Sequence, residues 1–425
     1  MKSYLEMDNK ELTSLLNDLE KQYDDIKKEN LSLNMARGKP ESEQLDLSMD
    51  MLDVITHDTD LLRSDDYRNY GILDGIDEIK PIFAEMLDTN CENLIIYGNS
   101  SLNIMFDQIS RGYTHGYLGN TPWCHLDSIK FLCPVPGYDR HFAITEHFGI
   151  EMIPIPTNEN GPDMDLVEKY VNNDESVKGI WCVPQYANPT GITYSSETVQ
   201  RFANLKPAAK DFRIFWDNAY LIHHLYDDDQ DHVDNILKAC QEAGNEDIVF
   251  EFCSTSKVTF PGSGVAAMAC SPANKKDALK HMTIQTIGHD KINQLRHALY
   301  FKDFKGVQNH MKKQAEILRP KFETVINILD KELGGLEIGT WTKPKGGYFV
   351  SFNAMEGCAK DIVQACKDAG TILTGAGATY PYGKDPQDSN IRIAPTYPPM
   401  DELLKAMQLF TLCVKLVSVK KILSK

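Results

Sequence analysis

The feature that most constrains the fold is a series of short apolar segments between residues 94 and 270. They cover residues 94–97, 129–133, 152–155, 180–183, 212–216, 248–252 and 265–270. Most of them are separated by amphipathic or charged stretches that are long enough for a crossover helix. This alternation is typical of a mainly parallel sheet between helices. The sequence therefore predicts an α/β fold whose large domain holds a seven-stranded sheet.

The two ends of the chain follow a different pattern. Leucines at helical spacing, such as Leu12 and Leu19, predict a surface helix before residue 31. After residue 275 the pattern is mainly helical to about residue 333, with a strand at 347–352 and a closing helix from about residue 400. We therefore expect a smaller α/β domain made from both ends of the chain. The predicted boundaries are 1–75 for the N-terminal arm and part of the small domain, 76–310 for the large domain, and 311–425 for the C-terminal part.

Charge and cysteine usage narrow the class of protein. The 425 residues carry a net charge of −17, which disfavours nucleic acid or an anionic membrane as a partner. The ten cysteines form no C-x-x-C pair, which favours reduced thiols over disulfides or zinc. The sequence shows neither a secretory h-region nor an apolar run of membrane-spanning length, so we expect a cytoplasmic protein.

Three common site motifs are incomplete. The glycines of residues 377–384 have the wrong spacing for a P-loop, and no G-x-G-x-x-G follows a strand. The pair His223 and His224 lacks further ligands, so no metal site is expected.

Polar residues instead follow the ends of several predicted strands, where open α/β sheets bind their ligands. Asn99 and Ser100 open a helix, which is either an anion seat or an ordinary N-cap. Asp217 ends a buried strand, which is costly unless the carboxylate meets a cation, although a plain helix cap is an alternative. Lys257 follows a strand among hydroxyl groups, which suits an amine that forms a Schiff base.

The combination of these motifs, from Asn34 to about Phe410, resembles the fold-type-I pyridoxal-5′-phosphate (PLP) enzymes of aminotransferase class I/II. The motifs are Asn188-Pro-Thr-Gly191, Asp217-x-Ala-Tyr220, Ser254-x-Ser-Lys257 and Arg392. The sequence of residues 254–264 is similar to that of the divergent aspartate aminotransferase branch, which is related to the effector domains of MocR regulators.

The resemblance implies a role for each of these residues. Lys257 would bind PLP covalently and move a proton, and Asp217, with His141 behind it, would pair with the pyridine nitrogen. Tyr220 and Asn188 would bind the 3′-oxygen, and Tyr138 would stack on the ring. Asn99, Ser100, Ser254 and Ser256 would bind the phosphate, with Tyr70 reaching in from the partner of a homodimer. Gly38, Asn188 and Arg392 would bind the substrate, with the Arg392 fork on its α-carboxylate.

One part of the family pattern is missing. Gly262-Ser-Gly264 lacks the arginine that usually clamps the phosphate, so we expect backbone amides and hydroxyls to hold it. A dicarboxylate substrate needs a second basic residue to bind its side-chain carboxylate. The candidates, which the sequence does not rank, are Arg37, Lys39, Arg140, Lys291 and Arg296.

The resemblance implies transamination between an amino acid and a 2-oxo acid, with L-aspartate and 2-oxoglutarate as the leading pair. An aminotransferase with another substrate is an alternative, as is a PLP lyase or decarboxylase, because the same lysine and aspartate serve both. A PLP-sensing regulator domain is disfavoured, because the residues before Asn34 are too few for a winged-helix module.

Overall fold

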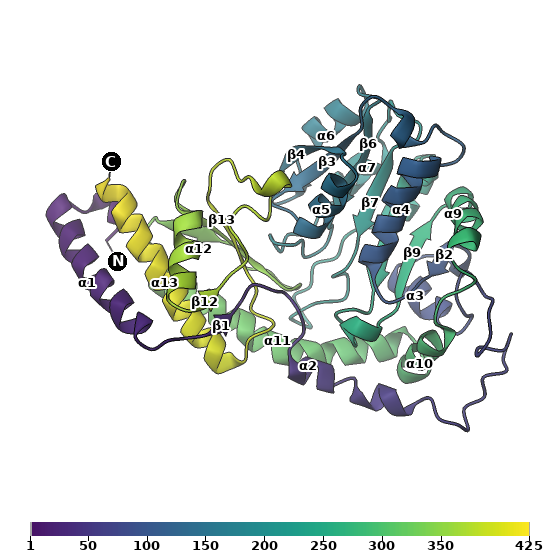
Figure 1. The fold of residues 1–425 in the computed structure, drawn as a ribbon, viewed down its shortest axis with the longest axis horizontal. Coiled ribbons are helices and arrows are strands. Elements are labelled where there is room, and N and C mark those ends of the chain that lie inside the picture. The colour runs from purple at the N-terminus through teal and green to yellow at the C-terminus, as the bar shows by residue number, and fades with distance from the viewer. Residues whose placement is uncertain (1, 425) are drawn as a thin grey trace.

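The computed structural model describes residues 2–424 as a larger body and a smaller one that are joined along a single long helix (Figure 1). This helix, α11 (Phe304–Leu333), packs on α3 and α10 of the larger body and on α13 of the smaller one. The predicted boundary between residues 310 and 311 falls inside α11. The three predicted ranges stay a prediction.

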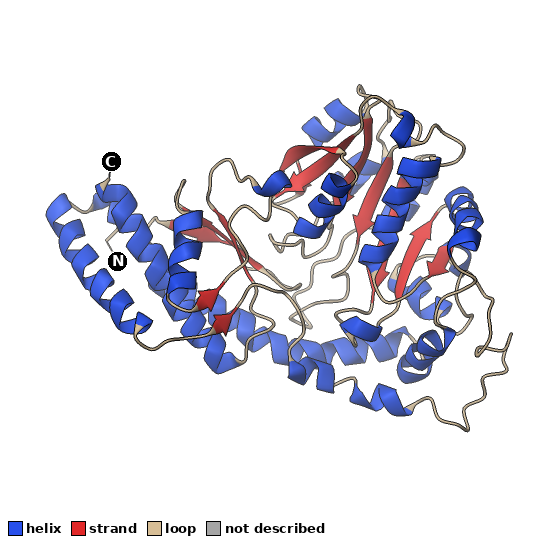
Figure 2. Ribbon diagram, viewed as in Figure 1, coloured by secondary structure: helices blue, strands red, loops and turns tan. Residues whose placement is uncertain are grey.

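The larger body is built on an eight-stranded sheet (Figure 2). Its strands are β2 (Leu94–Ile96), β3 (Lys130–Val135), β4 (Glu151–Asn158), β5 (Gly161–Pro162), β6 (Val177–Cys182), β7 (Arg213–Asp217), β8 (Val249–Ser254) and β9 (Ala266–Cys270). They lie in the order β2-β9-β8-β7-β6-β3-β4-β5, and the central pairs from β8 to β4 are parallel. Strand β9 is antiparallel to both of its neighbours. The predicted α/β class with a mainly parallel sheet is confirmed, and each of the seven predicted runs contributes a strand.

The eighth strand, β5, has only two residues and forms a hairpin with β4 through Thr157 and Pro162. It was missed because a two-residue Gly-Pro segment carries no apolar run or alternation that would predict a strand.

Helices cover both faces of this sheet. One face packs on α4 (Ser101–His115), α5 (Asp139–His147) and α9 (Pro272–Gln285), with Phe215 and Phe250 in the shared apolar cluster. The other face carries two clusters. One cluster lies under α6 (Met164–Val171), α7 (Ser196–Ala203) and α8 (Ile236–Glu242), and the other under α3 (Lys80–Met86), α10 (Lys291–Phe301) and α11.

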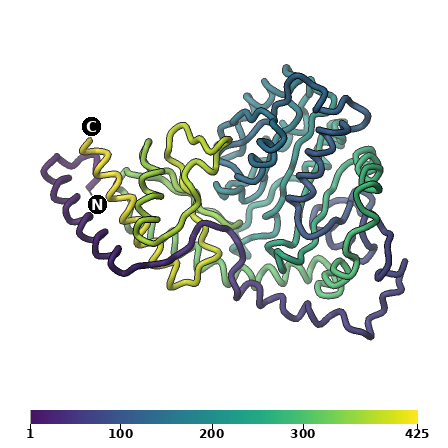
Figure 3. The backbone as a smooth tube through the Cα atoms, in the orientation of Figure 1, coloured from purple at the N-terminus to yellow at the C-terminus, as the bar shows by residue number. Residues whose placement is uncertain are grey.

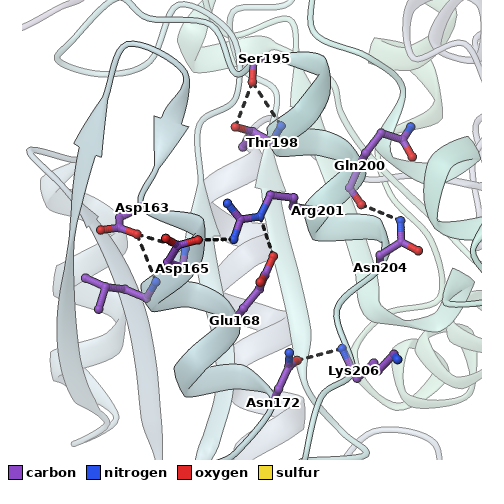
Figure 4. A network of polar contacts seen from close by, with 11 residues as sticks. Asp163, Asp165, Glu168, Asn172, Ser195, Thr198, Gln200, Arg201, Asn204 and Lys206 are labelled. Atoms are coloured by element: carbon purple, nitrogen blue, oxygen red, sulfur yellow. Dashed lines mark hydrogen bonds and ion pairs between the residues drawn. The ribbon is translucent and has the colours of Figure 1, made fainter.

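An ion-pair network joins α6 to α7 at the surface (Figure 4). Arg201 of α7 places its Nη2 2.6 Å from Asp165 and its Nε 2.6 Å from Glu168, both on α6. Asp163 and Ser195 cap the first turns of α6 and α7 through their side-chain oxygens. These caps fix where each helix begins after its strand, in keeping with the preference of N-caps for Asp and Ser.

The smaller body brings both ends of the chain together (Figure 3). Helix α1 (Asn9–Lys27) packs against α13 (Met400–Leu423), and β1 (Leu33–Asn34) pairs in parallel with β12 (Thr371–Ile372). A three-stranded antiparallel sheet holds β10 (Gly339–Trp341), β11 (Val350–Ala354) and β13 (Asn390–Ile393), next to α12 (Ala359–Asp368). The short helix α2 (Ser42–Asp46) leads from β1 toward the larger body.

Two general findings concern membranes and thiols. Within residues 2–424, no helix is both long enough and apolar enough to cross a membrane. None of the ten cysteines forms a disulfide within residues 2–424, and most of them are buried.

Candidate active site

A cavity of about 230 Å³ lies at the carboxyl ends of the central parallel strands, near the first turn of α4. Its walls contain eight of the residues selected from the sequence, namely Ser100, Tyr138, Asn188, Asp217, Tyr220, Ser254, Ser256 and Lys257. They come from the last residues of different strands and from the segments that follow them, and parallel strands end at one edge of a sheet.

Asp217 is the last residue of β7 and is almost fully buried. Its Oδ2 lies 2.9 Å from Nε2 of His141, whose ring stacks on Trp181 at a centroid distance of 4.5 Å. Its Oδ1 is buried and has no hydrogen-bond partner among residues 2–424. One carboxylate oxygen is therefore fixed in place while the other remains an acceptor for a ligand that carries an N–H group.

Lys257 lies in the turn after β8, with its Nζ 4.8 Å from the centroid of the Tyr220 ring and 5.8 Å from that of Tyr348. Burial lowers the pKa of its amine below the ordinary value, and the charge of Asp217 partly opposes this shift. A lower pKa leaves more of the amine neutral, which is the nucleophilic form. Burial raises the pKa of the Tyr220 hydroxyl well above its usual range, so this side chain stays a neutral donor.

The start of α4 and the turn after β8 form a polar seat beside the lysine. Ser100 caps α4 by accepting from the Leu102 N–H, and Ser256 donates to the backbone oxygen of Asn99 at 3.1 Å. Ser254 donates to Ser256 at 3.1 Å. Free N–H groups at a helix N-terminus together with hydroxyls are suited to an anion such as phosphate.

Arg392 lies on β13 and is mostly buried. Its Nη1 donates to Asp139 at 3.0 Å and to the Asn188 side-chain oxygen at 3.2 Å, and its Nη2 donates to Thr374 at 3.3 Å. Its guanidinium also lies over the Phe349 ring, at 4.8 Å from the centroid. The arginine is thus oriented toward Asn188 and holds a carboxylate of the chain itself.

Three other predicted residues lie outside the walls of the cavity. Asn99 borders it through its contact with Ser256. Gly38 lies against Phe349, and a Cβ at this position would come within 2.2 Å of that ring. A side chain at residue 38 would therefore displace the ring that packs on Arg392. Tyr70 is 75% exposed and does not line the cavity.

The basic residues that could bind a second substrate carboxylate lie at different places in the structure. Lys39 lies over the Tyr397 ring, Lys291 donates to the Gly71 carbonyl, and Arg37 and Arg140 are exposed. Arg296 of α10 donates to the Ser263 hydroxyl. Its guanidinium therefore lies at the 262–264 loop, which lacks the arginine of the family pattern.

Four residues near the site were missed from the sequence. Asp139 and Thr374 hold Arg392, Tyr348 lies beside Lys257, and Trp181 supports His141. Asp139 directly follows Tyr138 in the sequence, so its place beside a predicted site residue was a signal that could have identified it. Thr374 and Tyr348 are remote in sequence and carry no motif of their own.

The same arrangement has parallels among known proteins. A family model described as aspartate amino-transferase matches residues 7–425. The chain belongs to this family. The aspartate aminotransferase of Corynebacterium glutamicum is 45% identical over 404 residues, which cover 94% of this chain and 93% of that protein.

Solved structures extend the comparison. A crystal structure of an aspartate transaminase from Corynebacterium glutamicum has a TM-score of 0.95 at 43% identity and covers 99% of both chains. An α-aminoadipate aminotransferase from Thermus thermophilus, solved with N-(5′-phosphopyridoxyl)-L-leucine, has a TM-score of 0.74 at 18% identity. It covers 92% of this chain and 93% of that one, and this likeness shows the fold alone. The predicted relationship with fold-type-I aminotransferases of the aspartate aminotransferase branch is confirmed.

Within the aspartate aminotransferase family, the cavity can be tested for its fit to the cofactor that such folds carry. PLP presents an aldehyde carbon, a protonated ring nitrogen and a phosphate. Lys257 Nζ, Asp217 Oδ1 and the seat at Ser100 offer a nucleophile, an acceptor without a partner and an anion site in one cavity. The residues therefore fit the group. Among residues 2–424, no cluster of three or more His, Cys, Asp or Glu side chains has the arrangement of a metal site.

Proposed function

We propose that this protein catalyses PLP-dependent transfer of an amino group between an amino acid and a 2-oxo acid, with L-aspartate and 2-oxoglutarate as the pair. The observation that carries the proposal is the convergence of Lys257 and the open Oδ1 of Asp217 on one cavity. When bound, PLP supplies an electron sink for the negative charge that develops at the substrate Cα.

The cofactor is held by groups of the chain at three points in this proposal. Lys257 would bind it covalently through Nζ, and Asp217 would accept a hydrogen bond from its ring nitrogen and keep that nitrogen protonated. Asn188 and Tyr220 would donate to its 3′-oxygen. Tyr138 packs on the ring, next to His141 at a centroid distance of 4.9 Å.

The phosphate is assigned to the seat at the start of α4. Ser100, Ser254 and Ser256 supply hydroxyls, and Asn99 and the first N–H groups of α4 complete the seat. Tyr70 of a second subunit is assigned to the same group, in keeping with its exposure here.

The substrate is bound by Arg392, with Asn188 and the backbone at Gly38 beside it. A guanidinium binds a carboxylate with two parallel hydrogen bonds, and Asp139 already holds Arg392 at 3.0 Å. The substrate α-carboxylate would take the place of Asp139. Once the amine of Lys257 is free, it would take the proton from the substrate Cα, and its lowered pKa favours the neutral form that accepts a proton.

The choice of aspartate rests on a relative that carries this name and shares 45% identity over nearly the whole chain. The cation that would bind the second carboxylate is not assigned. A cytoplasmic location is proposed from the many buried cysteines that form no disulfide among residues 2–424.

The first experiment is a single-turnover assay of purified enzyme with each amino donor and no acceptor. An aminotransferase releases one equivalent of the matching oxo acid per site, and aspartate should react fastest. A decarboxylase would release CO₂ instead, and a sensor domain would release nothing.

The second experiment identifies the lysine. Borohydride reduction followed by peptide mapping should tag Lys257, and Lys257→Ala should lose both the tag and turnover. Lys276→Ala serves as a control, because Lys276 is an exposed lysine of α9 that does not line the cavity. A tag on any other lysine would refute the assignment.

A further inference from the structure

A second and larger cavity, of about 620 Å³, lies on the other face of the central sheet. Residues on β8 alternate between the two faces: Phe250 and Phe252 belong to the cluster under α4, whereas Cys253 belongs to the cluster under α3, α10 and α11. Glu251 points to the same side as Cys253 and lines this cavity. The cavity shares no lining residue with the Lys257 site, although Asn218 in its wall directly follows Asp217.

Glu251 is a buried carboxyl group in the cavity wall, with an exposed fraction of 4%. Among residues 2–424, the carboxyl group of Glu251 accepts one hydrogen bond, which the Asn218 side-chain amide donates to Oε1 at 3.0 Å. No lysine, arginine or histidine within the described chain forms an ion pair with it. Burial raises its pKa to about 7, and the charge of Asp88 adds to the shift.

Asn218 presents a second acceptor without a donor. Its Oδ1 is buried and has no hydrogen-bond partner within residues 2–424, and its side chain also lines the cavity. A buried acceptor that is left unsatisfied is destabilising, because it has lost its hydrogen bonds to water and gained none. Oε2 of Glu251 accepts no hydrogen bond among residues 2–424 either, so the wall offers a carboxylate oxygen and an amide oxygen that suit a ligand with N–H donors.

The remaining walls define the rest of that ligand. Apolar side chains such as Met86, Ile222 and Met311 give a surface for a hydrocarbon body. Of the two lysines in the lining, Lys312 lies 3.7 Å from Asp227, which offsets its charge. The volume is in the range of small-molecule sites and is far larger than a single ion needs.

We propose that this cavity binds a small organic cation, with a head group that bears N–H donors placed on Glu251 and Asn218 and with an apolar body against Met86 and Met311. The chemistry corresponds to an alkylguanidinium or alkylammonium ion. The site is distinct from the substrate site, because none of these residues lines the cavity of Lys257.

The test uses the holoenzyme and n-butylguanidinium, which does not react with an aldehyde as a primary amine does. n-Butylurea is the matched neutral probe, because it has the same shape without the charge. Calorimetric titration at pH 8 should show saturable binding of the guanidinium, at least tenfold tighter than that of the urea. Glu251→Gln should remove this preference.

A surface substitution with the same change in charge, Glu175→Gln, should leave the affinity unchanged, because Glu175 is exposed and distant from the cavity. The wild-type protein provides a second measurement that needs no variant. Its affinity for n-butylguanidinium should fall roughly tenfold between pH 8 and pH 6, since a carboxyl group with a pKa near 7 is mostly protonated at pH 6.

The other titratable groups that face the cavity are Asp88, Asp227, Asp234, His224, His232, Lys305 and Lys312. The pH dependence should therefore be measured in Glu251→Gln as well, where it should be lost. No saturable binding, or equal binding by the wild type and Glu251→Gln, would overturn the proposal.

Discussion

At the scale of single residues, Asp217 shows how a buried charge is prepared for a partner. His141 fixes Oδ2 at 2.9 Å, and the stack of His141 on Trp181 fixes the histidine in turn. Thr145 links the His141 backbone to the Trp181 ring, since it donates to the His141 backbone carbonyl and accepts from the Trp181 indole N–H. The carboxylate cannot rotate freely, so its open Oδ1 keeps one direction.

Asp217→Asn should retain cofactor but lose activity, because a neutral amide does not keep the ring nitrogen protonated. Removal of a preorganised electrostatic contact typically lowers kcat by about 10²–10³. Steady-state kinetics together with the cofactor content of the purified variant would measure both effects. Asp163→Asn is the control, because asparagine caps a helix as well as aspartate does. Near-normal turnover in Asp217→Asn would mean that Asp217 is only structural.

Arg392→Lys should raise the KM for the amino acid by roughly tenfold or more, since an ammonium group does not reproduce the two parallel hydrogen bonds of the fork. Asp139→Asn should act in the opposite direction and tighten substrate binding, because it removes the carboxylate that competes for Arg392. Initial rates over a range of donor concentrations would compare the two variants. Unchanged KM values in both would contradict the assigned role of Arg392.

The site residues at strand ends could be predicted from the sequence. The residues that hold them in place could not. Asn188, Asp217 and Lys257 each follow an apolar strand, so their positions at one edge of the sheet follow from the order of the strands. Thr374 and Tyr348 reach the site only because the smaller body packs beside the larger one. No local pattern encodes that contact. Arg296 at Ser263 was likewise beyond sequence reasoning, because α10 and the loop after Lys257 are about 30 residues apart and meet through packing alone.

At the scale of elements, the strands followed from their apolar runs, whereas the partner of α1 did not. Its leucines predict a helix with one apolar face, and they leave open what covers that face. The structure places α13 there, with Leu12 and Leu19 buried in the cluster of the smaller body.

Leu19→Ala should lower the free energy of unfolding by about 2–5 kcal/mol, the usual cost of a cavity in a packed core. Leu5→Ala should change it little, because Leu5 is 56% exposed. Urea unfolding followed by circular dichroism would compare the two variants. Equal effects would show that α1 does not depend on its contact with α13.

At the scale of the whole molecule, we predict a homodimer with shared sites. Tyr70 is 75% exposed and does not line the cavity of Lys257, which is consistent with its predicted role in the site of a second subunit. Mixing and refolding two inactive variants, Tyr70→Ala and Lys257→Ala, should restore about a quarter of the wild-type activity, because half of the dimers are hybrids with one intact site of two. A fully active monomer in sedimentation analysis, or mixtures that never regain activity, would contradict this prediction.

The pairing of β1 with β12 also has a consequence for biosynthesis. Leu33 is made early but finds its partner, Thr371, only after more than three hundred further residues have been added, and α1 waits still longer for α13. Chains are made from the N-terminus and domains fold as units, so the eight-stranded sheet can form while the ribosome is still at work. During that interval the apolar face of α1 has no cover. A nascent chain of this protein should therefore depend on chaperones at its first helix rather than at its last.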